Sequence, residues 1–161
     1  MSGSVTIAQA FAQSSNRAAF LMAHRLGEEK FTGYAQAFGL GQKTGVELTG
    51  EVSGRIITRG SRDWNPLTLS RMAIGHSVSV TPLQMVMAVA AVANNGMMMK
   101  PQIIRETRDP KGHLLKSFEP QEANRVCSPQ AAALLTKAME NVMLDSHGTG
   151  HNKVVVPGVR V

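Results

Sequence analysis

The sequence predicts an α+β fold that is mainly helical and carries a few antiparallel strands. Two observations predict the helices: apolar residues recur at helical spacing over residues 7–37, and Thr81-Pro82 and Ser128-Pro129 are strong helix starts. A third observation predicts the strands, because two extended segments flank a turn at residues 109–112. With 161 residues, of which 43% are hydrophobic, the chain suits a single domain or a piece of one.

The first helix is predicted over residues 7–13. Thr6 can cap it, since a threonine side chain accepts a hydrogen bond from the unpaired amides of the first turn. Ile7, Ala10 and Phe11 recur at helical spacing, so we expect them to form one buried face.

The later elements are predicted from residues that typically end helices or form loops. Gly27 closes a helix over residues 17–27. Five glycines between residues 39 and 57 indicate a loop with at most a short strand. The other predicted elements are a helix over 28–39, a helix over 82–93, strands over 97–109 and 113–120, a helix over 129–144, and a strand-like segment over 154–161.

Composition excludes several functions. The net charge is +6, but the basic residues are scattered, so a solvated basic face is favoured over nucleic-acid binding. A single cysteine, Cys127, excludes a disulfide within the chain. The apolar run over residues 85–93 is far shorter than the ~20 residues of a membrane-spanning helix. It therefore predicts a buried helix.

The histidines do not form a convincing metal site. His147 and His151 are four residues apart, but glycines lie between them, which favours a loop over a metal-binding helix face. His76 is expected to pack near the core. His24 is expected to face outward from its helix or to be a helical residue whose hydrogen bonds are satisfied.

Lys43-Thr44-Gly45 suggests two chemistries, and the sequence supports neither. A phosphate-binding loop needs glycine directly before its lysine, and Gln42 stands there. A serine acyl-transferase needs a nucleophile one helical turn before a lysine that takes its proton, as in S-x-x-K. Neither a serine nor a threonine in this chain has lysine three positions on.

Four segments carry a resemblance to a known family: residues 6–27 with Ser14-Ser15-Asn16, and residues 31–51, 72–101 and 148–161. Together they resemble the transpeptidase domain of the class B penicillin-binding proteins. The resemblance implies that residues 1–161 are a single partial transpeptidase domain of the penicillin-binding and serine β-lactamase-like fold. It also implies that S-x-x-K precedes this chain, that the catalytic K-T-G follows it on a core strand, and that Lys43-Thr44-Gly45 is coincidental.

The same resemblance identifies Ser14 and Asn16 as catalytic residues of the S-x-N motif. Ser14 would help to move a proton to the leaving D-alanine, and Asn16 would hydrogen-bond the nucleophile's lysine and the substrate amide. Ser15 is the variable middle position, expected to point away. Arg17 departs from the small or apolar residue that is more common in the family.

The implied function is that of a peptidoglycan D,D-transpeptidase, which cross-links stem peptides ending in D-Ala-D-Ala through an acyl-serine intermediate. The implied partners are these peptides, β-lactams that acylate the same serine, and a membrane synthase that polymerises glycan. No metal or organic cofactor is implied. The site would face the periplasm, or the outer surface of the membrane, on a protein anchored by an N-terminal helix. This chain alone is expected to be inactive.

Two other hypotheses remain open. A non-catalytic binding or scaffolding domain descended from such an enzyme would share the fold without the chemistry. A basic protein that binds an acidic polymer is disfavoured by the scattered charges. If core strands are missing, the apolar surface left open should make the chain self-associate. A monomer in light scattering at high concentration would contradict that expectation.

Overall fold

The structure is a computed structural model that describes residues 5–151 and 153. In this part of the chain, six helices and six short strands confirm the predicted α+β class. The predicted strand-like segment over 154–161 lies outside the described residues. The elements are α1 (Ile7–Ala12), α2 (Asn16–Leu26), α3 (Glu28–Ala37), β1 (Arg55–Ile56), α4 (Thr68–Met72), β2 (Val78–Ser79), α5 (Pro82–Ala93), β3 (Met97–Met99), β4 (Glu106–Arg108), β5 (Leu114–Ser117), β6 (Glu122–Arg125) and α6 (Pro129–Leu144).

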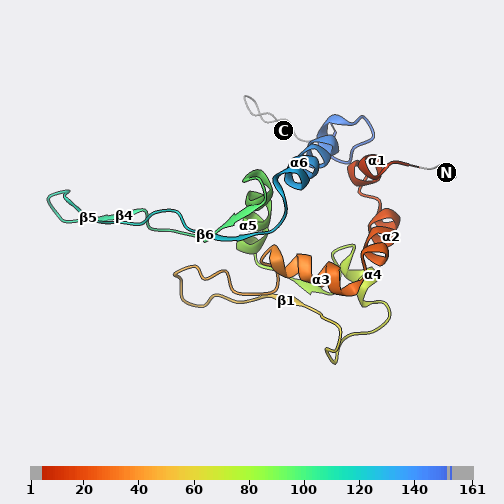
Figure 1. Cartoon of the computed structure of the whole chain (residues 1–161), viewed down its shortest axis with the longest axis horizontal. Helices are drawn as coiled ribbons and strands as arrows, with labels where there is room; N and C mark the ends of the chain where they lie inside the picture. Colours follow the sequence, from red (N-terminus) through yellow and green to blue (C-terminus); the bar gives the residue numbers. More distant parts are fainter. Residues whose placement is uncertain (1–4, 152, 154–161) are drawn as a thin grey trace.

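The main helices follow a curved path from α3 through α2, α1 and α6 to α5 (Figure 1). The path brings α1 against α6, so helices from opposite ends of the chain pack together. The hairpin formed by β4 and β5 projects away from the end that carries α5. Within the described residues, none of the helices combines the length and the apolar character needed to cross a membrane.

Capping residues start two helices as predicted. Gln9 N–H donates to Thr6 Oγ1 over 3.2 Å, and Thr6 N–H donates to Gln9 Oε1 over 3.0 Å. Thr81 and Gln84 repeat this reciprocal pair at the start of α5, with the same two distances. Because each pair satisfies two amides that a first turn leaves without helical partners, it fixes where the helix begins.

Two predictions of burial are wrong. Of the three α1 residues expected to be buried, Ile7 and Phe11 are 72% and 37% exposed and only Ala10 is buried, at 5%, beside Ala12 at 0%. The buried side of this short helix consists of small residues, which allow α6 to approach closely. His76 is also exposed rather than packed in the core, because the chain turns at Gly75, whose φ is +83°, between α4 and β2.

The strands form three separate antiparallel pairs in the described part of the chain: β1 with β2, β3 with β6, and β4 with β5. The predicted turn at residues 109–112 does join β4 to β5. The first predicted strand is divided, however, because Met97–Met99 pairs with β6 instead of β5. This β3–β6 pair supports a small core of Ala91, Met98 and Val126.

Gly96 allows the chain segments around that core to approach each other closely. Its φ is +80°, and a Cβ at this position would overlap the carbonyl oxygen and sulfur of Cys127. Only glycine combines this left-handed conformation with so close an approach. The turn from α5 into β3 can therefore pass directly over the chain that leaves β6.

A buried glutamine ties the glycine-rich loop to α5. Gln84 is 1% exposed. Its Nε2 donates to the carbonyl oxygens of Gln42 over 2.5 Å and of Ser53 over 2.8 Å. One side chain therefore caps α5 and fixes two points of the loop between α3 and β1.

The prediction that residues 85–93 form a buried helix is only partly right, because the side of α5 opposite Gln84 is apolar and open. Met85, Val86 and Val89 are 47%, 63% and 47% exposed. Side chains of this kind are normally covered when they gather on one helix. Self-association of the chain stays a prediction.

Candidate functional site

The turn between α1 and α2 carries the predicted catalytic residues. Ser14 N–H donates to the Phe11 carbonyl over 2.9 Å, and Ser15 N–H donates to the Ala10 carbonyl over 2.9 Å. Ser15 Oγ accepts a hydrogen bond from Ala18 N–H over 3.3 Å and caps α2. The hydroxyl of Ser15 is therefore engaged by its own helix.

Ser14 has a left-handed backbone conformation, with a φ of +50°. Residues other than glycine, asparagine and aspartate adopt this region rarely, and such conformations cluster at functional sites. The Ser14 side chain is exposed. Its Oγ lies 3.2 Å from Oγ1 of Thr149, a residue 135 positions further along the chain.

Asn16 is the first residue of α2 and is exposed, like Ser14. Its neighbour Arg17 is exposed too, and both border a shallow apolar hollow that includes Phe20 and Ile74. The turn therefore exposes two short polar side chains, a hydroxyl and an amide. Their catalytic roles stay predictions.

Sequence reasoning missed the contact between Ser14 and Thr149. The G-T-G at residues 148–150 contributed to the family resemblance, but three small residues are a weak signal by themselves. The glycines on both sides of Thr149 were the available signal, since a threonine flanked by glycines often marks a tight loop. Neither Ser14 nor Thr149 indicates its partner through local sequence.

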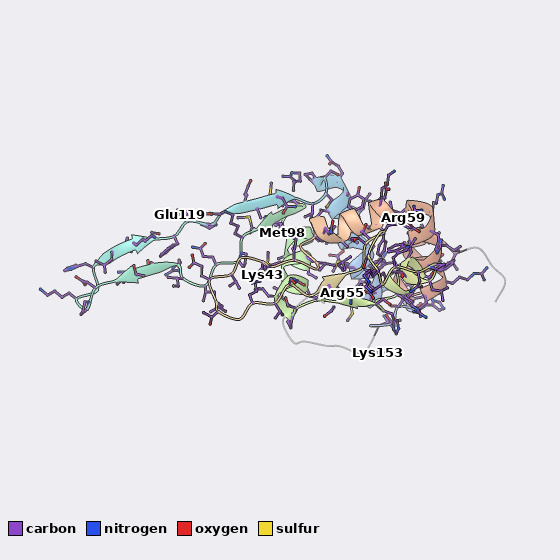
Figure 2. The ribbon with its side chains drawn as sticks, turned by 90° about the horizontal axis from the view of Figure 1, so that it is seen from below. Lys43, Arg55, Arg59, Met98, Glu119 and Lys153 are labelled. Atoms are coloured by element: carbon purple, nitrogen blue, oxygen red, sulfur yellow. The ribbon has the colours of Figure 1, made fainter. Side chains whose placement is uncertain are left out.

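Lys43-Thr44-Gly45 lies on the loop between α3 and β1, not on a strand. In Figure 2, Lys43 lies nearer to the β4–β5 hairpin than Lys153 does. Lys153 follows the G-T-G segment. The Glu51 carboxylate accepts hydrogen bonds from Thr44 Oγ1 over 2.5 Å, from Thr44 N–H over 2.6 Å and from Gly45 N–H over 3.2 Å. The motif therefore forms a structural loop, as the resemblance implied.

These bonds make the loop sensitive to acid. The hydrogen bond from the Thr44 hydroxyl lowers the pKa of the Glu51 carboxyl, with the Thr44 and Gly45 amides adding to the effect against an opposing loss of hydration. Because the folded pKa is depressed, the stabilisation is present above the ordinary glutamate pKa and is lost as pH falls through the lowered value. We expect hydrogen exchange at Thr44 and Gly45 to lose protection in that acidic window.

Glu51→Gln should weaken this protection at neutral pH and remove its dependence on pH. Glu47→Gln is the matched control, since Glu47 is an exposed carboxylate of the same loop. Hydrogen exchange followed by mass spectrometry measures both variants. Protection that stays constant through the acidic window in the unaltered chain would contradict the assignment.

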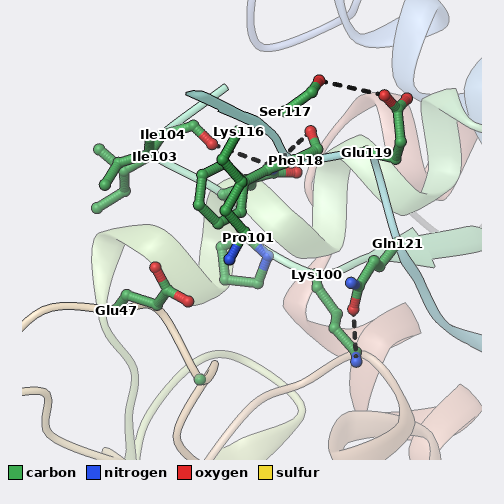
Figure 3. A pocket seen from close by; sticks show the side chains of 12 residues that line it. Glu47, Lys100, Pro101, Ile103, Ile104, Lys116, Ser117, Phe118, Glu119 and Gln121 are labelled. Carbon is green, nitrogen blue, oxygen red and sulfur yellow. Dashed lines mark hydrogen bonds between the residues drawn. The ribbon is translucent and has the colours of Figure 1, made fainter. Parts of the chain in front are cut away.

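A cavity of about 460 Å³ lies at the root of the hairpin (Figure 3). Several of its polar side chains have partners within the protein. Lys100 Nζ donates to Gln121 Oε1 over 3.0 Å, Gln102 Nε2 donates to the Phe118 carbonyl over 2.8 Å, and the Lys116 ammonium lies 4.3 Å from the centre of the Phe118 ring. These contacts hold the projecting hairpin at its base, away from Ser14 and Asn16.

The histidines also make structural contacts. His151 Nδ1 donates to the Met143 carbonyl over 3.0 Å, and His147 N–H donates to Asp145 Oδ1 over 2.8 Å. His24 of α2 is exposed, and its Nε2 lies 3.1 Å from Oγ of Ser70 in the neighbouring helix α4. Across residues 5–151 and 153, no group of three or more potential ligands could hold a metal ion.

Comparisons with known proteins connect the chain to a family. The family described as "Penicillin binding protein transpeptidase domain" matches residues 1–161. Stage V sporulation protein D of Bacillus subtilis is 37% identical over 141 residues, covering 87% of this chain and 21% of the relative. Penicillin-binding protein PbpB of Mycolicibacterium smegmatis is 37% identical over 133 residues, covering 83% and 20%. The chain spans about a fifth of the length of these curated relatives.

Solved structures agree with the sequence comparisons. Penicillin-binding protein 2X from Streptococcus thermophilus matches with a TM-score of 0.83 at 28% identity, over 97% of this chain and 23% of that one. Ligand-free penicillin-binding protein 3 from Mycobacterium tuberculosis matches with a TM-score of 0.82 at 33% identity, over 95% and 34%. The fold, the turn and both comparisons lead to one conclusion: the chain belongs to the penicillin-binding protein transpeptidase domain family.

Proposed function

We propose that this chain supplies the S-x-N part of a serine-type peptidoglycan D,D-transpeptidase. The observation that carries the proposal is the turn at Ser14-Ser15-Asn16, in which Ser15 caps α2 while Ser14 and Asn16 are exposed beside it. Two curated relatives support the reaction class: "Peptidoglycan D,D-transpeptidase PbpA" of Mycolicibacterium smegmatis and "Probable peptidoglycan D,D-transpeptidase FtsI" of Caulobacter vibrioides. The full-length protein that carries this chain would form an acyl-serine intermediate with stem peptides ending in D-Ala-D-Ala.

In this reaction a serine attacks the carbonyl of the peptide bond between the two D-alanines. The serine oxygen forms an ester, the C–N bond breaks, and the departing nitrogen needs a proton. Ser14 is the proposed donor, because its hydroxyl can give one proton while accepting another. Asn16 supplies both a donor and an acceptor, which suits it to holding the peptide in place.

These 161 residues contain no S-x-x-K, and we propose that another part of the full-length protein supplies the nucleophile. We therefore propose that the isolated chain is inactive and that the full-length protein is acylated by penicillins. Penicillin-binding protein 3 from Mycobacterium tuberculosis, a solved relative, has been crystallised with aztreonam and with ampicillin. β-Lactams are thus the ligands of choice for a test.

Intact-protein mass after incubation with a fluorescent penicillin tests the proposal. We expect one adduct on the full-length protein and none on residues 1–161 alone, because only the former would supply a serine with its lysine. Peptide mapping should place the adduct on an S-x-x-K serine. A full-length protein that never forms an adduct would favour the non-catalytic scaffolding function, and an adduct on the isolated chain would refute the assignment of the nucleophile.

The partners and location follow from the same reaction. We propose that the active face lies on the outer side of the cytoplasmic membrane, where peptidoglycan is cross-linked, and that a glycan-polymerising synthase supplies the strands. Accessibility of an engineered surface cysteine to a membrane-impermeant maleimide in intact cells tests the location. Labelling that requires cell lysis would contradict it.

A further inference from the structure

The loop after α6 is docked on the S-x-N turn. Thr149 N–H donates to the Ala12 carbonyl over 3.0 Å at the end of α1, and Thr149 Oγ1 lies 3.2 Å from Ser14 Oγ. The other side of the loop is tied to α6, where Gly150 N–H donates to the Val142 carbonyl over 3.1 Å. Both the backbone and the side chain of Thr149 are therefore directed at the turn.

The glycines on either side of Thr149 lie in close contact with α6. A Cβ on Gly148 would overlap the Val142 carbonyl oxygen, and a Cβ on Gly150 would overlap the Met143 sulfur. Because the obstacle at Gly148 is backbone, only glycine fits there, whereas a Cβ at Gly150 would also require the flexible Met143 side chain to move. The G-T-G segment presents a single side chain, that of Thr149, to Ser14.

Ser14 has a fixed backbone and a hydroxyl that needs orienting. The hydrogen bond from its amide to Phe11 and its φ of +50° fix the position of its Cβ. A serine hydroxyl can still rotate among staggered positions and has one donor and two acceptor sites. Thr149, by contrast, is β-branched and stiff at χ1, and its amide is anchored on Ala12.

We propose that Thr149 is a positioning residue that orients the Ser14 hydroxyl for proton transfer during acylation, an inference that rests on the proposed function. In the required arrangement the Thr149 hydroxyl donates to Ser14 Oγ. The hydrogen of Ser14 then points away from Thr149 and toward the substrate side. Thr149 neither gains nor loses a proton over the cycle, so the effect is purely one of orientation.

The test measures penicillin acylation of the full-length protein, separating the acylation rate constant from the non-covalent dissociation constant. Thr149→Val keeps the shape of the side chain and removes its hydroxyl. It should slow acylation roughly 3- to 10-fold, as expected for one neutral hydrogen bond, and leave the dissociation constant unchanged. Thr149→Ser should retain most of the acylation rate. Thr149→Ala should slow acylation as much as Thr149→Val does.

Thr136→Val is the matched control, because the Thr136 hydroxyl donates to the Ala132 carbonyl within α6 and, in the described structure, makes no hydrogen bond to the turn. Its acylation rate should equal that of the unaltered protein. Since serine and alanine at position 149 differ only by the hydroxyl, their comparison remains decisive if valine is poorly accommodated.

A double-mutant cycle separates orientation from general structural damage. If Thr149 acts through Ser14, Thr149→Val should have no further effect on acylation in a Ser14→Ala background. Equal losses in both backgrounds, or an unchanged rate in Thr149→Val alone, would overturn the inference while leaving the proposed function intact. An unaltered full-length protein that forms no adduct would overturn both.

Discussion

Ser14→Ala should lower the acylation rate constant of the full-length protein by about 10²–10⁴-fold, the usual contribution of a general acid–base group. The substitution removes only the hydroxyl. Because alanine and serine both carry a Cβ, the left-handed backbone at this position, with its φ of +50°, is equally strained in both. Stopped-flow measurement with a fluorescent penicillin gives the rate constant directly.

Two companion variants separate chemistry from conformation. Ser14→Gly relieves the backbone strain and also removes the hydroxyl, so it should be as slow as Ser14→Ala while unfolding at the same or a higher temperature. Ser15→Ala removes the cap of α2, which costs about 1 kcal/mol of stability, and should leave the acylation rate close to normal. A Ser14→Ala protein that is acylated at the normal rate would exclude a proton-transfer role.

Gln84→Glu should destabilise the fold by about 2–4 kcal/mol, because it replaces a buried donor with an acceptor facing the carbonyl oxygens of Gln42 and Ser53. For a domain of this size, that corresponds to a fall of roughly 5–15 °C in the thermal midpoint. A carboxylate can still cap α5 through Thr81, so the loss would come from the loop contacts. Thermal unfolding at neutral pH measures it.

The first helix offers a matched control. Gln9 occupies the same capping position relative to Thr6 as Gln84 does relative to Thr81, but it is exposed. Gln9→Glu should therefore leave the thermal midpoint nearly unchanged. Equal shifts for the two variants would mean that Gln84 acts only as a cap and that its bonds to the loop are unimportant.

The sequence was sufficient for features determined locally. Thr6, Thr81 and Ser128 each accept a hydrogen bond within the first turn of a helix, so their meaning can be read from a few neighbouring residues. The turn at 109–112 was found for the same reason. Assigning Ser14 and Asn16 to a site needed the resemblance to a family, since a short polar turn is common in any helical protein.

Features set by distant partners could not be predicted in this way. Met97–Met99 pairs with β6 because the chain returns after the hairpin, and adjacent sequence favoured β5 as the partner. Ile7 and Phe11 have helical spacing, yet the helix buries alanines where α6 approaches. The Ser14–Thr149 contact joins residues 135 positions apart. No local pattern encodes any of these partners.

The packing of α1 against α6 has a consequence for synthesis on the ribosome. Residues 13–128 must be translated before the first residue of α6 exists, which takes on the order of ten seconds at about 5–20 residues per second. During that interval α1, only six residues long, has no long-range packing partner and is too short to persist alone. The S-x-N turn would therefore be among the last parts of the nascent chain to acquire its final shape. It would do so when Thr149 emerges and contacts Ser14.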